Sequence, residues 1–396
     1  PHLPHAPMEP PAALAHVHDG RCDVWACTQN PQAARTNVAK VLGLDESAVT
    51  VNVTFLGGGF GRKSKADFPA EAALLSREVG APVRVQWTRE DDLHHDYVNT
   101  VSAQKLTAGL DASGKLIAWR HRTAFPPIAS TFGDADRPGA GDLQQGVLDL
   151  ALDVPNVRAE ACVAKAHARI GWLRSVYNIF HAFSVGSFVG ELAAARKTDL
   201  KTTWLEVLGP PRQPTLEALG IKELRNYGEP IEKHPVDVGR LRGVIERVTA
   251  ASEWDAREKH GRFFGLAVHR SFLSYVAAVV SVVKRGDKVA VDEVWIAADA
   301  GVVVNLERAH SQLEGAVIFG LNLALFGGLT YKNGAVEQSN FHQLKLARMH
   351  DVPRLIHTDV VTSDALSGGL GEPGVPPVAP ALANAVFALT GKRVRQ

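Results

Sequence analysis

The sequence is poor in cysteine, carries no excess charge of either sign and contains no long apolar run. Its 396 residues include only Cys22, Cys27 and Cys162, too few for a disulfide framework, a zinc ribbon or an iron–sulfur cluster. With 43 basic and 42 acidic side chains the net charge is +1, so we expect no nucleic-acid partner. No run reaches the roughly 18 apolar residues that cross a bilayer, so we expect no transmembrane segment.

Apolar residues make up 45% of the chain and charged residues 21%, which is enough to bury a sizeable core. The length predicts about two or three domains. The chain opens on Pro1, and we therefore expect a processed product or a piece of a longer polypeptide.

The pattern between residues 23 and 87 predicts alternating helices and strands. Asn30 followed by Pro31 begins a helix that Gly43 ends, and residues 49–55 alternate as a β-branched strand does. Glycines follow, then a helix over residues 68–79 and a strand over residues 82–87. This order indicates α/β architecture with a glycine-rich loop after a strand, where such sheets place ligands.

The remainder of the chain predicts a second lobe. Five prolines lie in residues 208–238, which we interpret as a linker between a first lobe of residues 1–207 and a second of residues 239–396. We therefore expect an α+β fold of two α/β lobes. Further predicted elements are a hairpin over residues 101–122, helices over 183–196, 306–321 and 380–390, and paired strands over 275–283 and 289–297.

The loop Gly57-Gly58-Gly59-Phe60-Gly61 fits neither common phosphate loop. Both a Walker loop and a dinucleotide fingerprint that begin at Gly57 require glycine where the chain has Arg62. Consecutive glycines indicate that the backbone approaches something closely or adopts positive φ. The residues alone leave a plain turn and a ligand loop both open.

Glu372 lies in a stiff frame of glycine and proline, Gly369 to Pro377. A carboxylate held and partly desolvated in this way would have a raised pKa and could act as a general base, whereas the alternative is an exposed glutamate in a tight turn. Two other polar clusters are interpreted as non-functional. We expect a solvated terminal segment around His2, His5, His16 and His18, and a polar loop over residues 90–96.

Short motifs along the whole chain resemble the molybdenum-binding large subunit of the xanthine dehydrogenase and aldehyde oxidase family. Within that family they are most similar to the isoquinoline 1-oxidoreductase branch, and specifically to its β-subunit. Because the motifs occur in the family's order, they are more specific than any single glycine loop. They are Met8-Glu9-Pro10, Trp25-Ala26-Cys27-Thr28-Gln29-Asn30-Pro31, Gly57-Gly58-Gly59-Phe60-Gly61-Arg62-Lys63, Trp87-Thr88-Arg89-Glu90-Asp91-Asp92, Gly171-Trp172-Leu173-Arg174-Ser175-Val176, Asp299-Ala300-Gly301, Gln312-Leu313-Glu314-Gly315-Ala316 and Gly371-Glu372-Pro373.

The resemblance implies a role for each matched position. Glu372 would be the catalytic base and Gln29 would hydrogen-bond the apical oxygen of the molybdenum. No side chain would ligate the metal, because the pterin dithiolene holds it. The resemblance further implies molybdopterin cytosine dinucleotide as the cofactor, held between the two lobes by Gly58, Gly59, Phe60, Gly61, Arg62, Arg174, Ser175 and Gln312.

The same resemblance implies a molybdenum hydroxylase that oxidises an aldehyde or N-heteroaromatic substrate with oxygen from water. Ser64 stands where purine-oxidising members carry a substrate-binding glutamate, so we do not expect a purine substrate. A Met-Gly-Gln-Gly segment is absent from the 396 residues. We therefore expect a partner chain with the remaining, amino-terminal part of the large subunit, and a small subunit whose [2Fe-2S] clusters receive the electrons.

Two alternatives stay open. One is a nucleotide-binding protein that uses the loop from Gly57 to Ser64, and the other is a non-catalytic scaffold subunit of a molybdenum hydroxylase complex. The compartment is open between the bacterial periplasm and the cytoplasm.

Overall fold

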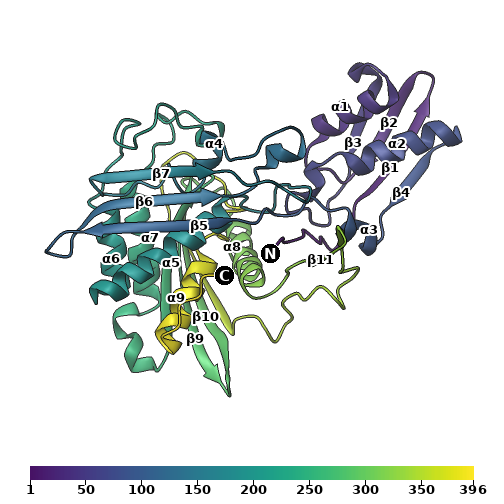
Figure 1. Ribbon diagram of the computed structural model, residues 1–396. Coiled ribbons are helices and arrows are strands. Elements are labelled where there is room, and N and C mark those ends of the chain that lie inside the picture. Colours follow the sequence, from purple (N-terminus) through teal and green to yellow (C-terminus); the bar gives the residue numbers. More distant parts are fainter.

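The computed structural model describes the backbone of residues 1–396 and every side chain except those of residues 258–260. Helices and several sheets alternate along the chain, so the expected α+β fold class is confirmed. Figure 1 shows a small body made of the first sheet with two helices, set apart from a larger body that contains the other main sheets. Within the described part of the chain, no helix combines the length and the apolar character needed to span a membrane.

The small body is one four-stranded sheet in the order β3-β2-β1-β4, on which two helices pack. Apolar side chains of both layers, among them Cys22, Val24, Val38 and Phe68, form its core. The helix predicted after Asn30 is confirmed, because the Asn30 side chain accepts from the Ala33 amide and Gly43 closes the helix at φ 70°. Its elements are β1 (Ala12–His18), β2 (Arg21–Ala26), α1 (Pro31–Leu42), β3 (Val49–Val53), α2 (Asp67–Val79) and β4 (Val83–Gln86).

The larger body is centred on a sheet in the order β13-β10-β9-β8 that is covered on both faces. One face packs on α5, α6 and α7, and the other on α8 and α9, which explains why β9 and β10 are almost continuously apolar. The predicted pairing of these two strands is confirmed. The elements are α5 (Asn178–Arg196), α6 (Leu200–Leu208), α7 (Val238–Ala251), β8 (Phe263–Ser271), β9 (Ser274–Arg285), β10 (Lys288–Asp299), α8 (Leu306–Leu325), β13 (Leu355–Val360) and α9 (Val378–Thr390).

A third sheet in the order β5-β6-β7 joins the larger body through Trp119 and Leu116, which pack in the same core as α5. The predicted hairpin is thus confirmed as β5 and β6. The boundary expected at residues 208–238 stays a prediction, and that segment is largely irregular. The remaining elements are α3 (Arg89–His94), β5 (Ala103–Leu110), β6 (Leu116–Ala124), α4 (Ala140–Leu143), β7 (Asn156–Cys162), β11 (Tyr331–Lys332), β12 (Ala335–Val336) and the 3-10 turns Glu46–Ala48, Arg62–Ser64, Ile128–Thr131, Asn226–Gly228 and Trp254–His260.

Two expectations about the amino-terminal third were wrong. The segment of His5 and His16 is not a solvated tail, because His5 is buried and His16 lies in strand β1. Residues 90–96 do not form a polar loop, because α3 turns Asp92 into the interior and the next turn buries Asp96. Each of these buried acidic groups faces cationic partners, and pairing of this kind is what makes the burial of charge tolerable.

Candidate active site

The glycine loop after β3 is shaped by close backbone contacts. Gly58 and Gly61 adopt φ of 90° and 108°, and Phe60 between them adopts 54°. A Cβ atom at Gly59 would overlap the side-chain amide of Gln29, and one at Gly61 would overlap the main-chain carbonyl of Trp172. The loop therefore requires glycine because two other segments lie against it.

Gln29 comes from the turn between β2 and α1. Its side-chain Oε1 accepts a hydrogen bond from the Gly61 amide at 3.1 Å, and its own backbone amide donates to the Lys63 carbonyl at 3.0 Å. The residue is exposed, and none of the described side chains or carbonyls binds its Nε2 group. The glutamine is thus fixed against the loop while one donor remains free for a ligand.

Arg174 and Ser175 connect the glycine loop to the carboxyl-terminal glutamate. The Arg174 amide donates to the Phe60 carbonyl at 2.9 Å, and the next amide, that of Ser175, donates to Glu372 Oε1 at 2.9 Å. The Ser175 hydroxyl also donates to the Glu372 carbonyl at 2.7 Å. Consecutive peptide groups therefore hold Phe60 and Glu372 at one place, although the two residues are far apart in the sequence.

The Arg174 side chain reaches across to α8. Its Nε donates to the Gly371 carbonyl at 2.6 Å, and its Nη2 donates to Gln312 Oε1 at 3.1 Å. The guanidinium also lies 5.5 Å from the centroid of the Phe319 ring, which in turn lies 5.2 Å from that of Phe60. Gln312 is exposed on α8 and keeps its Nε2 group free of the described acceptors.

Burial changes the acidity of Glu372. Desolvation is the largest influence and raises the pKa of its carboxyl, while the hydrogen bond from Ser175 and the charge of Arg174 act in the opposite direction. The net result is a pKa above the ordinary value. A carboxylate with this property and a fixed orientation suits the role of a general base.

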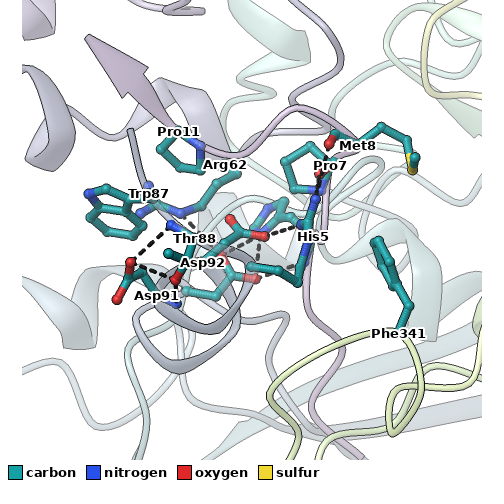
Figure 2. A network of polar contacts seen from close by, with 12 residues as sticks. His5, Pro7, Met8, Pro11, Arg62, Trp87, Thr88, Asp91, Asp92 and Phe341 are labelled. Atoms are coloured by element: carbon teal, nitrogen blue, oxygen red, sulfur yellow. Dashed lines mark hydrogen bonds and ion pairs between the residues drawn. The ribbon is translucent and has the colours of Figure 1, made fainter. Parts of the chain in front are cut away.

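Arg62 is the predicted site residue that points elsewhere. Its fully buried guanidinium pairs with Asp67 at 2.8 Å and lies 3.3 Å from Asp96. His5 lies against the same Asp96 at 2.9 Å (Figure 2). We therefore correct the expectation for Arg62: its side chain supports the loop from beneath and is not available to a bound group.

The buried charges beneath the loop make a stability prediction. Burial alone would raise the pKa of Asp96, but His5 and Arg62 lower it below the ordinary value. Its ionised form therefore stabilises the fold at neutral pH, and this contribution is lost as the pH falls through the lowered pKa. We expect Asp96→Asn to reduce the free energy of unfolding by about 3–5 kcal/mol, because its buried cationic partners lose their counter-charge.

Urea unfolding of the purified chain measures this loss. The exposed Asp136, which pairs only with the neighbouring Arg137 among the described residues, provides a matched control as Asp136→Asn. Equal stability of the two variants would contradict the buried ion-pair network.

The arrangement fits a bulky anionic, oxygen-rich cofactor. The loop presents backbone without side chains, and the Phe60 amide has no acceptor among the described residues. The free amide groups of Gln29 and Gln312 are further donors of the site. In the part of the chain that the structure describes, no three His, Cys, Asp or Glu side chains are grouped to hold a metal ion, so a metal here would have to arrive within a cofactor.

Comparison with known families decides between these possibilities. The molybdopterin cofactor-binding domain matches residues 1–201, and a second molybdopterin cofactor-binding domain matches residues 240–353. The chain belongs to the molybdopterin cofactor-binding family. The resemblance to the molybdenum-binding large subunits of xanthine dehydrogenases and aldehyde oxidases is thereby confirmed, and the cofactor of this family is a molybdopterin.

Curated relatives cover the chain from end to end. It is 28% identical to the beta chain of isoquinoline 1-oxidoreductase from Brevundimonas diminuta, over 98% of this chain and 48% of the relative. It is also 31% identical to a membrane-bound aldehyde dehydrogenase of Gluconacetobacter polyoxogenes, over 99% of this chain and 51% of that protein. Against one of the subunits of nicotinate dehydrogenase from Pseudomonas putida, the identity is 28%, over 100% of the chain and 33% of the relative. The chain thus spans about half, or less, of the length of these relatives.

Solved structures share the fold at low identity. Quinoline 2-oxidoreductase from Pseudomonas putida 86 superposes with a TM-score of 0.79 at 14% identity, and the match covers 98% of this chain and 72% of that protein. Aldehyde oxidoreductase from Desulfovibrio gigas gives 0.80 at 13%, covering 99% and 58%. These two oxidoreductases therefore have the fold described above.

Proposed function

We propose that this molybdopterin-binding chain is the catalytic portion of a molybdenum hydroxylase, which oxidises an aldehyde or an N-heteroaromatic compound with oxygen from water. The observation that carries the proposal is the pairing of Phe60 and Glu372 through Arg174 and Ser175. It places a desolvated carboxylate beside a glycine loop with free donors. The names of the relatives, an isoquinoline oxidoreductase and an aldehyde dehydrogenase, support both substrate classes.

Each residue then has a defined task. When bound, the molybdenum cofactor supplies the two-electron oxidation. Glu372 would accept the proton of the attacking water, for which its raised pKa is suited. The free amides of Phe60 and Gln29 would donate to oxygens of the cofactor, and the Arg174 guanidinium would hold the Glu372 segment against α8.

The finer assignments belong to the same proposal. We propose molybdopterin cytosine dinucleotide as the form of the cofactor, bound by Gly58, Gly59, Phe60, Gly61, Ser175 and Gln312. The remaining part of the large subunit would complete the cradle, and [2Fe-2S] clusters on a small subunit would receive the electrons. The limited coverage of the relatives by this chain and its three scattered cysteines support this division.

The geometry disfavours the nucleotide-binding alternative. In a phosphate loop, basic side chains of the loop would have to face the ligand. Here Arg62 pairs with Asp67, and Lys63 lies buried with its Nζ 2.5 Å from Glu9. Both cations of the loop are therefore committed to the protein interior.

The proposal is tested with the assembled enzyme in water labelled with ¹⁸O. We expect aldehydes or N-heteroaromatics to be oxidised with one labelled oxygen in the product, detected by mass spectrometry. Product formation without label, or an assembly that carries molybdenum but oxidises neither class, would overturn the proposal.

Replacement of Arg174 gives a further prediction. The guanidinium binds Gly371 and Gln312 at the same time, and a lysine ammonium cannot reproduce that fork. We expect Arg174→Lys to lower kcat/KM by about 10- to 100-fold, the range for loss of a charged hydrogen bond. Steady-state kinetics of the assembled enzyme check this value, with Arg158→Lys, a largely exposed arginine on β7, as the control.

A further inference from the structure

Lys65 follows the glycine loop directly and has an unusual environment. The residue is only 7% exposed, yet among the described residues no hydrogen bond or ion pair reaches its Nζ atom. Nζ instead lies 3.9 Å from the ring centroid of Trp172, 4.0 Å from that of Phe132 and 5.0 Å from that of Tyr97. Ring faces attract an ammonium group but accept its hydrogen bonds only weakly, so the group has donors to offer.

The charges around Lys65 leave its ammonium uncompensated. Burial lowers its pKa to about 8, a change that Arg62 assists and Asp67 opposes. Asp67 itself is committed to Arg62 at 2.8 Å. Arg169, which also lies against the Tyr97 ring, donates to the His95 carbonyl. At neutral pH, Lys65 is therefore still mostly protonated, and among the described residues its ammonium has no anionic partner.

The three rings connect this ammonium to the candidate active site. Trp172 is two residues before Arg174, and its carbonyl is the group against which Gly61 packs. Trp172 is 41% exposed, and Phe132 is 64% exposed. A flat ligand could thus lie on these two rings with its charged end at Nζ, beside the contact between Phe60 and Arg174.

We propose that Lys65, Trp172 and Phe132 form a subsite for the carboxylate of a planar aromatic acid, so that the enzyme prefers substrates that carry such a group. A single free cation matches a monoanion. The Lys65 amide is already bonded to the Arg62 carbonyl at 3.2 Å, so it offers no additional donor of the kind that a phosphate would require. The reference to substrates rests on the proposed function, whereas the binding of the acid does not.

Binding of benzoate to the assembled complex, measured by isothermal titration calorimetry against benzamide, tests the subsite. We expect benzoate to bind about 10- to 100-fold more tightly, as one charge-assisted hydrogen bond allows. Lys65→Met should abolish this preference, Lys65→Arg should keep most of it, and Lys40→Met, an exposed lysine on α1, should leave it unchanged. In the unmodified protein, the preference should decline as the pH rises above about 8.

Equal affinity for benzoate and benzamide, or a preference that survives in Lys65→Met, would overturn the subsite. If Lys65→Met fails to assemble, the pH dependence of the unmodified complex decides. Failure of the proposed function gives a different pattern, namely Lys65-dependent benzoate binding without oxidation of any aldehyde or N-heteroaromatic. Oxidation without a preference for carboxylate-bearing compounds would remove the subsite alone.

Discussion

The Glu372→Gln enzyme is expected to retain its molybdenum and lose nearly all turnover. The substitution keeps the size of the side chain and an oxygen that can accept from the Ser175 amide, so the local structure should persist. It removes the proton acceptor, and a positioned general base contributes about 10²–10⁴-fold to a rate. We therefore expect kcat to fall by at least this factor, measured by steady-state oxidation of the preferred substrate.

The pH profile adds a second readout for Glu372. A base must be ionised to act, so kcat/KM of the unmodified enzyme should rise with pH through the raised pKa of this residue. The exposed Glu337 on the loop after β12 serves as the matched control, and Glu337→Gln should keep both rate and profile. An active Glu372→Gln enzyme with an unchanged acid limb would refute the assignment of the base.

Substitution of Gly61 should have the second largest effect, on cofactor binding. An alanine would be strained at φ 108°, and its Cβ would overlap the Trp172 carbonyl. Strain of about 1–3 kcal/mol corresponds to roughly a 5- to 150-fold change in the population of the native loop. We expect Gly61→Ala to lower molybdenum content and activity together, measured by elemental analysis and by assay.

Gly133→Ala is the control for Gly61, because a Cβ atom at position 133 meets open space. Urea unfolding of both variants separates local from global effects. If Gly61→Ala binds the cofactor as the unmodified protein does, the close contact between the glycine loop and the Trp172 segment has no functional role.

The elements that short patterns predicted well are those with local end signals. Pro31 and Gly43 delimit α1, and Asn305 begins α8 by accepting from the Arg308 amide, as expected. Strands β1 and β2 were missed because alanine, histidine and arginine interrupt the apolar alternation in them. Their identity as strands depends on the sheet around them, which a short window of sequence does not contain.

The chemistry of the site was visible in motifs, but its assembly was not. Glu372 could be recognised as a pre-oriented carboxylate, whereas its contact with Ser175 joins residues separated by 197 positions. The role of His5 was also missed, because its partner Asp96 lies 91 positions away in the chain. No periodicity encodes such contacts, and they follow only from the packing of distant segments.

Molybdenum analysis of the intact native assembly tests the central claim most directly. If Phe60, Gln29, Gln312 and Glu372 surround a molybdopterin, elemental analysis should give one molybdenum per copy of this chain, and acid hydrolysis should release CMP. An intact assembly with far less than stoichiometric molybdenum would contradict the account and favour the non-catalytic scaffold.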